Sequence, residues 1–84
     1  MRLTPAQRAG LAILATPDSE ARPSEESIRW SVRVGDAEIG TIHSETLMCL
    51  RRAGLVRWIS PAPPDWLPRQ SISDAGRAYV EHLS

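Results

Sequence analysis

The most informative stretch of the chain is Ile42-His43-Ser44-Glu45-Thr46-Leu47-Met48-Cys49-Leu50-Arg51-Arg52-Ala53-Gly54-Leu55-Val56. Ser44 is a residue type that favours the N-cap of a helix, and Leu47 and Leu50 are spaced to face inward together. Gly54 is the expected stop, because glycine readily adopts the left-handed conformation that ends many helices. The stretch therefore predicts a helix over 43–53 that leads directly into a strand.

Downstream, the sequence predicts a hairpin and a last helix. Residues 55–60 are typical of a strand, residues 61–65 of a stiff turn with three prolines, and residues 66–72 of the returning strand. Ser73 is placed to cap a final helix. Its expected inner face follows helical spacing and consists of Gly76, Tyr79, Val80 and Leu83.

Upstream, the sequence predicts a first helix over 4–15. Thr4 is an N-cap type, and Gln7 completes a capping-box pattern with it. The following residues, 16–26, are polar and include two prolines, which predicts a loop.

The next segment, 28–42, predicts a strand and leaves its continuation open. Residues 28–34 alternate apolar and polar side chains, which is the pattern of a half-buried strand. Gly35-Asp36 is a turn dipeptide. Residues 37–42 then return as a second strand, or a short helix lies within 35–42.

Three segments resemble winged helix-turn-helix proteins. The stretch 42–56 resembles their recognition helix, where a Thr-aliphatic-x-x-Leu-x-x-x-Gly-Leu-Val run leads into the wing. Ser71-Ile72-Ser73-Asp74-Ala75-Gly76-Arg77 looks like the Leu-Thr-x-x-Gly-Arg signature that opens their C-terminal helix, and Leu3-Thr4-Pro5-Ala6-Gln7 is similar to their first-helix opening. MarR-like regulators are the nearest comparison. The resemblance implies an α+β winged helix, with three helices and a C-terminal β-hairpin wing. The length predicts one domain, 1–84, and the alternation over 28–34 adds an extra strand or hairpin at 28–42, where the family usually has a helix.

The resemblance also implies a function in DNA binding, with 44–53 as the recognition helix and 55–72 as the wing. In such proteins the leading end of the helix meets base edges, and arginines reach phosphates. We therefore expect a small transcription regulator of bacterial or phage type that binds double-stranded DNA as a homodimer. The expected DNA-binding residues are Ser44, Thr46, Arg51, Arg52, Arg57 and Arg69.

The alternative is a winged-helix module that binds a protein partner instead of DNA. Ten arginines and ten acidic residues leave a net charge of zero, and the predicted wing tip at 61–65 ends in an aspartate. An acidic tip repels phosphate. Trp58 and Trp66 flank this tip, where they either stack across the hairpin or form a protein interface.

The composition excludes several other classes. Zero net charge excludes a polybasic tail, and a hydrophobic content of 42% is typical of a globular domain. No apolar run approaches the roughly 20 residues that span a bilayer, and the first residues lack a signal-peptide pattern. The single cysteine, Cys49, favours a reducing cytoplasm. His43 and His82 lack metal-ligand spacing, so we expect no metal. The sequence has neither a Gly-rich phosphate loop nor a Ser/His/Asp order that suggests a triad, so we expect no cofactor and no enzymatic activity.

Overall fold

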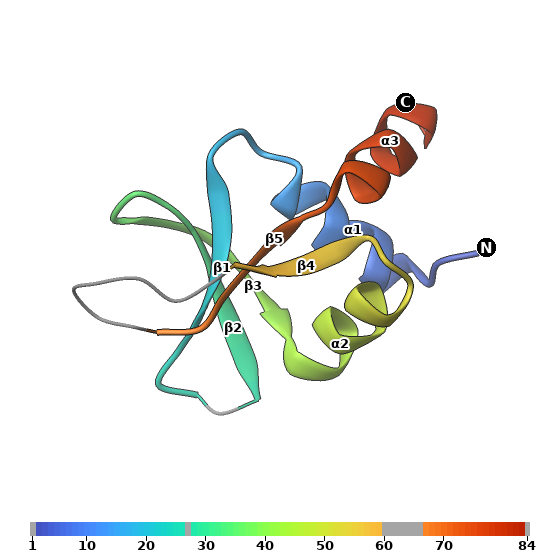
Figure 1. The fold of residues 1–84 in the computed structure, drawn as a ribbon. Coiled ribbons are helices and arrows are strands. Elements are labelled where there is room, and N and C mark those ends of the chain that lie inside the picture. The colour runs from blue at the N-terminus through green and yellow to red at the C-terminus, as the bar shows by residue number, and fades with distance from the viewer. Residues whose placement is uncertain (1, 27, 60–66, 84) are drawn as a thin grey trace.

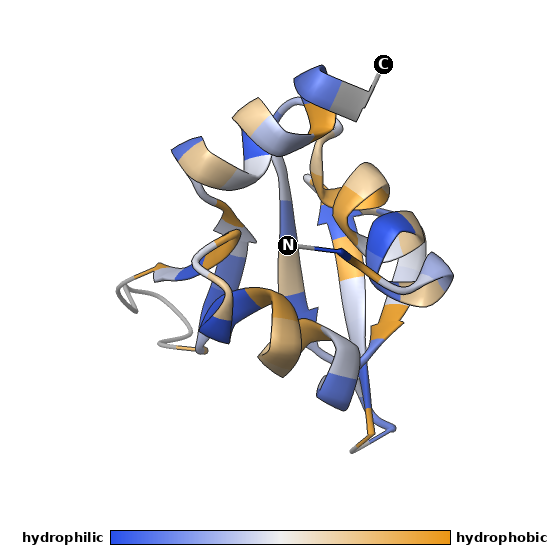
Figure 2. Cartoon of the chain, turned by 90° about the vertical axis from the view of Figure 1, so that its right-hand side faces the viewer, coloured by the Kyte–Doolittle hydropathy of each residue, from blue (hydrophilic) through white to orange (hydrophobic). Residues whose placement is uncertain are grey.

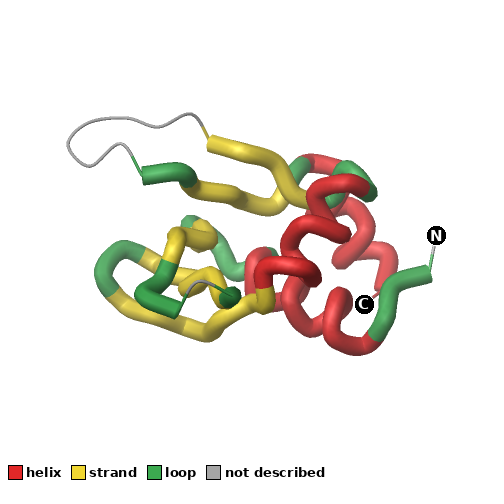
Figure 3. Tube along the Cα trace, turned by 90° about the horizontal axis from the view of Figure 1, so that it is seen from below, coloured by secondary structure: helices red, strands yellow, loops and turns green. Residues whose placement is uncertain are grey.

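The computed structural model describes residues 2–26, 28–59 and 67–83 of the chain. Its elements follow in the order α1 (Pro5–Leu14), β1 (Ser19–Pro23), β2 (Arg29–Val34), β3 (Ala37–His43), α2 (Ser44–Arg52), β4 (Val56–Ile59), β5 (Arg69–Ile72) and α3 (Asp74–Leu83). The strands form one five-stranded antiparallel sheet in the order β3-β2-β1-β5-β4. The three helices gather on one side of the molecule, and the strands extend from the other (Figures 1 and 3).

The first helix begins as the sequence predicts. The Thr4 hydroxyl accepts from the Gln7 backbone N–H at 3.2 Å, and the Thr4 N–H donates to Gln7 Oε1 at 3.0 Å. This reciprocal pair is a capping box, which satisfies two backbone donors at the helix start. Leu11 and Leu14 then face the interior.

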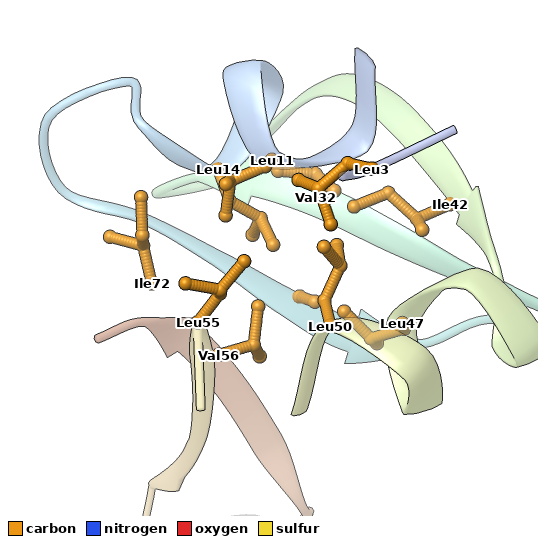
Figure 4. Packing of buried hydrophobic residues seen from close by; sticks show 11 residues of the cluster. Leu3, Leu11, Leu14, Val32, Ile42, Leu47, Leu50, Leu55, Val56 and Ile72 are labelled. Carbon is orange, nitrogen blue, oxygen red and sulfur yellow. The ribbon is translucent and has the colours of Figure 1, made fainter. Parts of the chain in front are cut away.

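The core lies between the helices and one face of the sheet. Leu11 of α1, Leu47 and Leu50 of α2 and Val32 of β2 belong to one hydrophobic cluster, and all four side chains are fully buried (Figure 4). Burial of each such side chain contributes about 1.5–3 kcal/mol. Figure 2 looks onto the helical side, where hydrophobic and hydrophilic residues alternate along each helix. The helices are therefore amphipathic, and their apolar stripes hold the layer on the sheet.

The prediction of a winged helix with a C-terminal hairpin wing is wrong. The five strands occupy the middle of the chain, and a helix, α3, follows them at the C-terminal end. The predicted loop 16–26 contains β1, which lies at the centre of the sheet between β2 and β5. The β4–β5 hairpin is therefore one edge of a continuous sheet and not a separate wing.

The central strand was missed because its own side chains carry little signal. Its sequence is Ser-Glu-Ala-Arg-Pro, with Ala21 as the one apolar side chain besides the terminal proline. Ala21 is completely buried, and the Ser19 hydroxyl donates to the Leu14 carbonyl at 3.0 Å. Strand formation here depends on neighbours that are distant in sequence, so local pattern could not reveal it.

The segment 28–42 forms a hairpin, and the alternative of a short helix within 35–42 is wrong. β2 and β3 pair along their length around the predicted Gly35-Asp36 turn. Gly35 has a φ of +62°, a conformation that glycine adopts without strain.

The ends of α2 confirm one prediction and correct another. The N-cap is His43 and not Ser44, since His43 Nδ1 accepts from the Glu45 backbone N–H at 3.1 Å. Gly54 follows the helix with a φ of +80°, as predicted for its stop. The strands after it are shorter than expected, and the predicted turn at 61–65 lies outside the described residues.

The last helix approaches the start of β4 very closely. The Ser73 hydroxyl accepts from the Gly76 N–H at 3.0 Å, which confirms Ser73 as the cap. A Cβ atom on Gly76 would lie 2.1 Å from the Leu55 carbonyl oxygen, so the contact requires glycine. Tyr79 and Val80 pack against the core, as predicted, whereas the side chain of Leu83 lies outside the described part.

Candidate functional site

The sheet presents two chemically different faces. Strand pairing places Ala21, Val32 and Gln70 on the face that the helices cover, and their neighbours in sequence on the other face. We call this second face the outer face. Five arginines from four strands lie on it: Arg22, Arg29, Arg33, Arg57 and Arg69. The strands set only two carboxylates among them, Glu20 and Glu38, so the strand residues of this face carry a net charge of +3.

Glu20 of β1 organises the centre of the outer face. Its Oε1 accepts from Arg22 Nε at 2.6 Å and lies 3.4 Å from Arg69 Nη1 on the neighbouring strand. The three side chains are 17%, 29% and 23% exposed, in the order Glu20, Arg22, Arg69. Within the described residues, Arg69 Nε is buried without a hydrogen-bond partner. Two guanidinium groups therefore share one carboxylate, and they keep N–H donors, such as Arg69 Nε, that the described residues do not satisfy.

Arg57 extends this positive group to the edge strand β4. Its side chain is exposed, and none of the ion pairs in the described part of the chain involves it. β4, β5 and β1 are adjacent, and neighbouring strands lie about 4.8 Å apart. We call Arg57, Arg69 and Arg22 the arginine path. With Glu20 included, it carries a net charge of +2 over about 10 Å.

The charge is balanced at the β2–β3 end of the same face. Arg29 Nε lies 3.8 Å from Glu26, and the Arg33 guanidinium donates to the Asp36 backbone carbonyl. A shallow hollow of about 810 Å³ lies here, and its lining includes four acidic side chains, Arg29 and Arg33, and also Arg22 of the arginine path. Arg57 and Arg69 do not line this hollow, so the more positive end of the face lies toward β5 and β4.

The structure separates the six residues predicted to bind DNA. Arg57 and Arg69 lie on the outer face, whereas Ser44, Thr46, Arg51 and Arg52 lie on α2. Ser44 is half-buried and its N–H donates to the Ile28 carbonyl at 2.8 Å. Thr46 lines a small hollow beside α1. Arg52 is exposed, but Arg51 turns toward the sheet, so the six side chains do not form one surface.

Arg51 belongs to a second group of side chains on the face that carries the core. Its guanidinium carbon lies 4.8 Å from the centroid of the Trp58 ring. Trp58 meets Trp30 edge to face, with centroids 5.9 Å apart and an interplanar angle of 64°. We call Trp30, Trp58 and Arg51 the tryptophan cluster. Trp58 is 48% exposed, whereas the other predicted interface residue, Trp66, lies outside the described residues.

Sequence reasoning missed several of these residues. Arg22 and Glu20 were missed because β1 was interpreted as a loop. Arg29 and Arg33 alternate with apolar residues in a predicted strand, so that alternation could have placed them on the polar face. The contact between Trp30 and Trp58 joins strands that are not adjacent in the sheet, and nothing local in the sequence indicates it.

Other site types find no support in the part of the chain that the structure describes. It contains no group of three or more His, Cys, Asp or Glu side chains arranged to hold a metal ion. None of its helices combines the length and apolar character that crossing a membrane requires. No family model matches the chain, and no curated protein or solved structure gives a match either. The absence of enzymatic activity and of a cofactor stays a prediction.

Proposed function

We propose that the protein binds double-stranded DNA through the arginine path on the outer face of its sheet. The observation that carries the proposal is the alignment of Arg57, Arg69 and Arg22 on three adjacent strands with Glu20 as the one carboxylate among them. Guanidinium groups bind phosphate with paired hydrogen bonds, which a compact ammonium group does less well. A row of them on a rigid sheet, with Arg57 exposed and Arg22 and Arg69 partly exposed, suits a phosphate backbone.

The outer face favours a duplex over a single strand. Proteins that hold single strands usually stack bases on aromatic side chains. Among the described strand residues, the outer face offers no Phe, Tyr or Trp ring, since Trp30 and Trp58 both point to the opposite face. Phosphate contacts position a protein on DNA without reading its sequence. The proposal is therefore for binding to the DNA backbone without reading of its sequence. We place this activity in the cytoplasm, as the single cysteine favours. A homodimer would double the number of phosphate contacts.

The salt dependence of binding tests the proposal. Three phosphate contacts predict a slope of log K against log salt of about −2.7. Fluorescence anisotropy with a labelled 20-base-pair duplex, from 25 to 200 mM salt, measures that slope. Arg57→Gln should weaken binding and reduce the slope by about one unit. Arg57 is chosen because its side chain is exposed and outside the ion pairs of the described residues.

Arg52→Gln is the matched control, because Arg52 is an exposed arginine on α2. It should leave both affinity and slope unchanged. A loss with Arg52→Gln and none with Arg57→Gln would place the DNA contact on α2 and overturn the proposal. Absence of any binding at 25 mM salt by the folded protein, checked by circular dichroism, would overturn it as well.

A further inference from the structure

The tryptophan cluster lies away from the arginine path and has no role in the proposed DNA binding. Its members come from three elements: Trp30 from β2, Trp58 from the edge strand β4, and Arg51 from α2. Trp58 leaves nearly half of its surface in solvent, although a neighbouring side chain on the same face, Val56, is buried. Exposed tryptophan next to arginine is the composition of binding hot spots.

Among the residues that the structure describes, the charge of Arg51 has no acidic partner. Its Nη1 donates to Gln70 Oε1 at 3.3 Å, and Gln70 is a neutral side chain with 1% of its surface exposed. None of the ion pairs among the described residues includes Arg51. The guanidinium is half-buried, stacked on Trp58, and has further N–H donors available. A cation in such surroundings favours an incoming carboxylate, because screening by water is reduced.

A second exposed apolar side chain lies near the other end of α2. Ile28 is 55% exposed, and its carbonyl accepts from the N–H of Ser44, the first residue of α2. Arg51 lies near the C-terminal end of this helix, about 10 Å away along its axis. Exposed apolar side chains therefore lie near both ends of α2, with Arg51 beside Trp58 at the C-terminal end.

We propose that the tryptophan cluster docks a segment of a protein partner in which acidic and apolar side chains alternate. An apolar side chain packs on Trp58 and Trp30, and a neighbouring carboxylate binds Arg51. Charge complementarity selects this class of partner, because the half-buried Arg51 guanidinium lies beside Trp58 and takes part in none of the ion pairs among the described residues. The proposal is independent of DNA binding, which uses the opposite face of the sheet.

Three peptides and the intact protein test this proposal. The probe is an eight-residue peptide of alternating Asp and Leu, capped at both ends. Its matched controls replace Asp by Lys or Leu by Ser. Nuclear magnetic resonance of the ¹⁵N-labelled protein follows the indole N–H signals of Trp30 and Trp58. Both signals should move with the Asp–Leu peptide and stay in place with the two controls.

Four single-residue variants test which side chains bind the peptide. Arg51→Gln should weaken binding of the Asp–Leu peptide about tenfold, as expected for the loss of a charge-assisted contact. Arg52→Gln removes the same charge from an exposed position and should change the affinity less than twofold. Arg57→Gln, on the outer face, should leave peptide binding unchanged. Trp58→Ala should abolish binding of the Asp–Leu peptide. If the Trp58→Ala protein fails to fold, the Arg51→Gln variant still tests the proposal.

Several outcomes would overturn the proposal. Equal binding of the Asp–Leu and Lys–Leu peptides would show that charge does not select the partner. If the indole signals did not change at millimolar Asp–Leu peptide, the tryptophan cluster would not be a peptide-binding site. Equal effects of Arg51→Gln and Arg52→Gln would show a diffuse attraction. A dimer in light scattering that Trp58→Ala dissociates would assign the surface to a second copy of the chain. Movement of the same signals by an eight-nucleotide oligothymidylate would assign it to single-stranded DNA.

Discussion

Three consecutive residues of β4 show how differently the two faces of the sheet are used. Val56 is buried under the helices, Arg57 is exposed on the outer face, and Trp58 returns to the first face beyond the reach of the core. The helix-covered face depends on shape and apolar contact, whereas the outer face depends on charge. We therefore expect substitutions of buried residues on the first face to change stability most, and substitutions of exposed arginines on the second to change DNA binding.

The largest effect is expected where α2 meets the helix-covered face. Leu50→Ala removes a fully buried side chain and should lower the free energy of unfolding by about 2–5 kcal/mol. Urea denaturation followed by circular dichroism measures it. Cys49→Ala is the control, since this neighbour is exposed and should change stability by less than about 0.5 kcal/mol. Similar losses in both variants would contradict the placement of α2.

Alanine substitutions at two helical glycines should have the next largest effects on stability. Gly76→Ala should lower stability and Gly10→Ala should raise it. Gly76→Ala should destabilise by about 1–3 kcal/mol, because its Cβ would meet the Leu55 carbonyl oxygen at 2.1 Å. In Gly10→Ala the new Cβ would lie 3.5 Å from Ile42, an ordinary contact. That variant should be up to about 1 kcal/mol more stable, because alanine favours the helix. Thermal unfolding compares the two, and stabilisation by Gly76→Ala would contradict the close approach of α3 to β4.

Glu20→Gln tests whether the outer face separates stability from binding. The variant leaves Arg22 and Arg69 without their shared carboxylate, and it should lower stability by about 1 kcal/mol, since these groups are partly screened by water. The same change removes the one negative charge from the arginine path and raises its net charge by one, so DNA affinity at low salt should rise. Urea denaturation and anisotropy measure the two effects. A fall in DNA affinity of the folded variant would contradict the proposed path.

The smallest changes in stability are expected from the two neighbours on β4. Trp58→Ala should cost about 1 kcal/mol through its lost ring contacts, and Arg57→Gln less than about 0.5 kcal/mol. Their binding effects should not overlap. Arg57→Gln should weaken DNA binding alone, and Trp58→Ala should abolish binding of the Asp–Leu peptide alone. Loss of both activities in either variant would mean that the two faces do not act separately.

Much of the local structure could be predicted from the sequence. The capping box at Thr4 and Gln7 and the glycine stop at Gly54 depend on residues a few positions apart, and the structure confirms them. Alternation over 28–34 likewise predicted β2. These signals are reliable because the partners that satisfy them are local.

The candidate site was much less predictable. Arg57 and Arg69 were selected as DNA contacts, but they were grouped with residues of α2 that lie elsewhere on the molecule. Arg22 completes the arginine path from a segment interpreted as a loop. Which arginines share a face depends on strand order and register, and a one-residue change of register would move each side chain to the other face.

By itself, the sequence determined where most helices and strands begin and end, because caps, stops and periodicity act over a few residues. The sequence also determined which cationic groups are present, because arginine is its one basic residue type besides histidine. Only the tertiary structure decided that β1 joins two hairpins into one sheet. Ser-Glu-Ala-Arg-Pro becomes a central strand because Ala21 is covered by distant residues and Glu20 is held by Arg69 from β5. Such contacts form only once the chain has folded, and they place the arginines on one face and the tryptophans on the other.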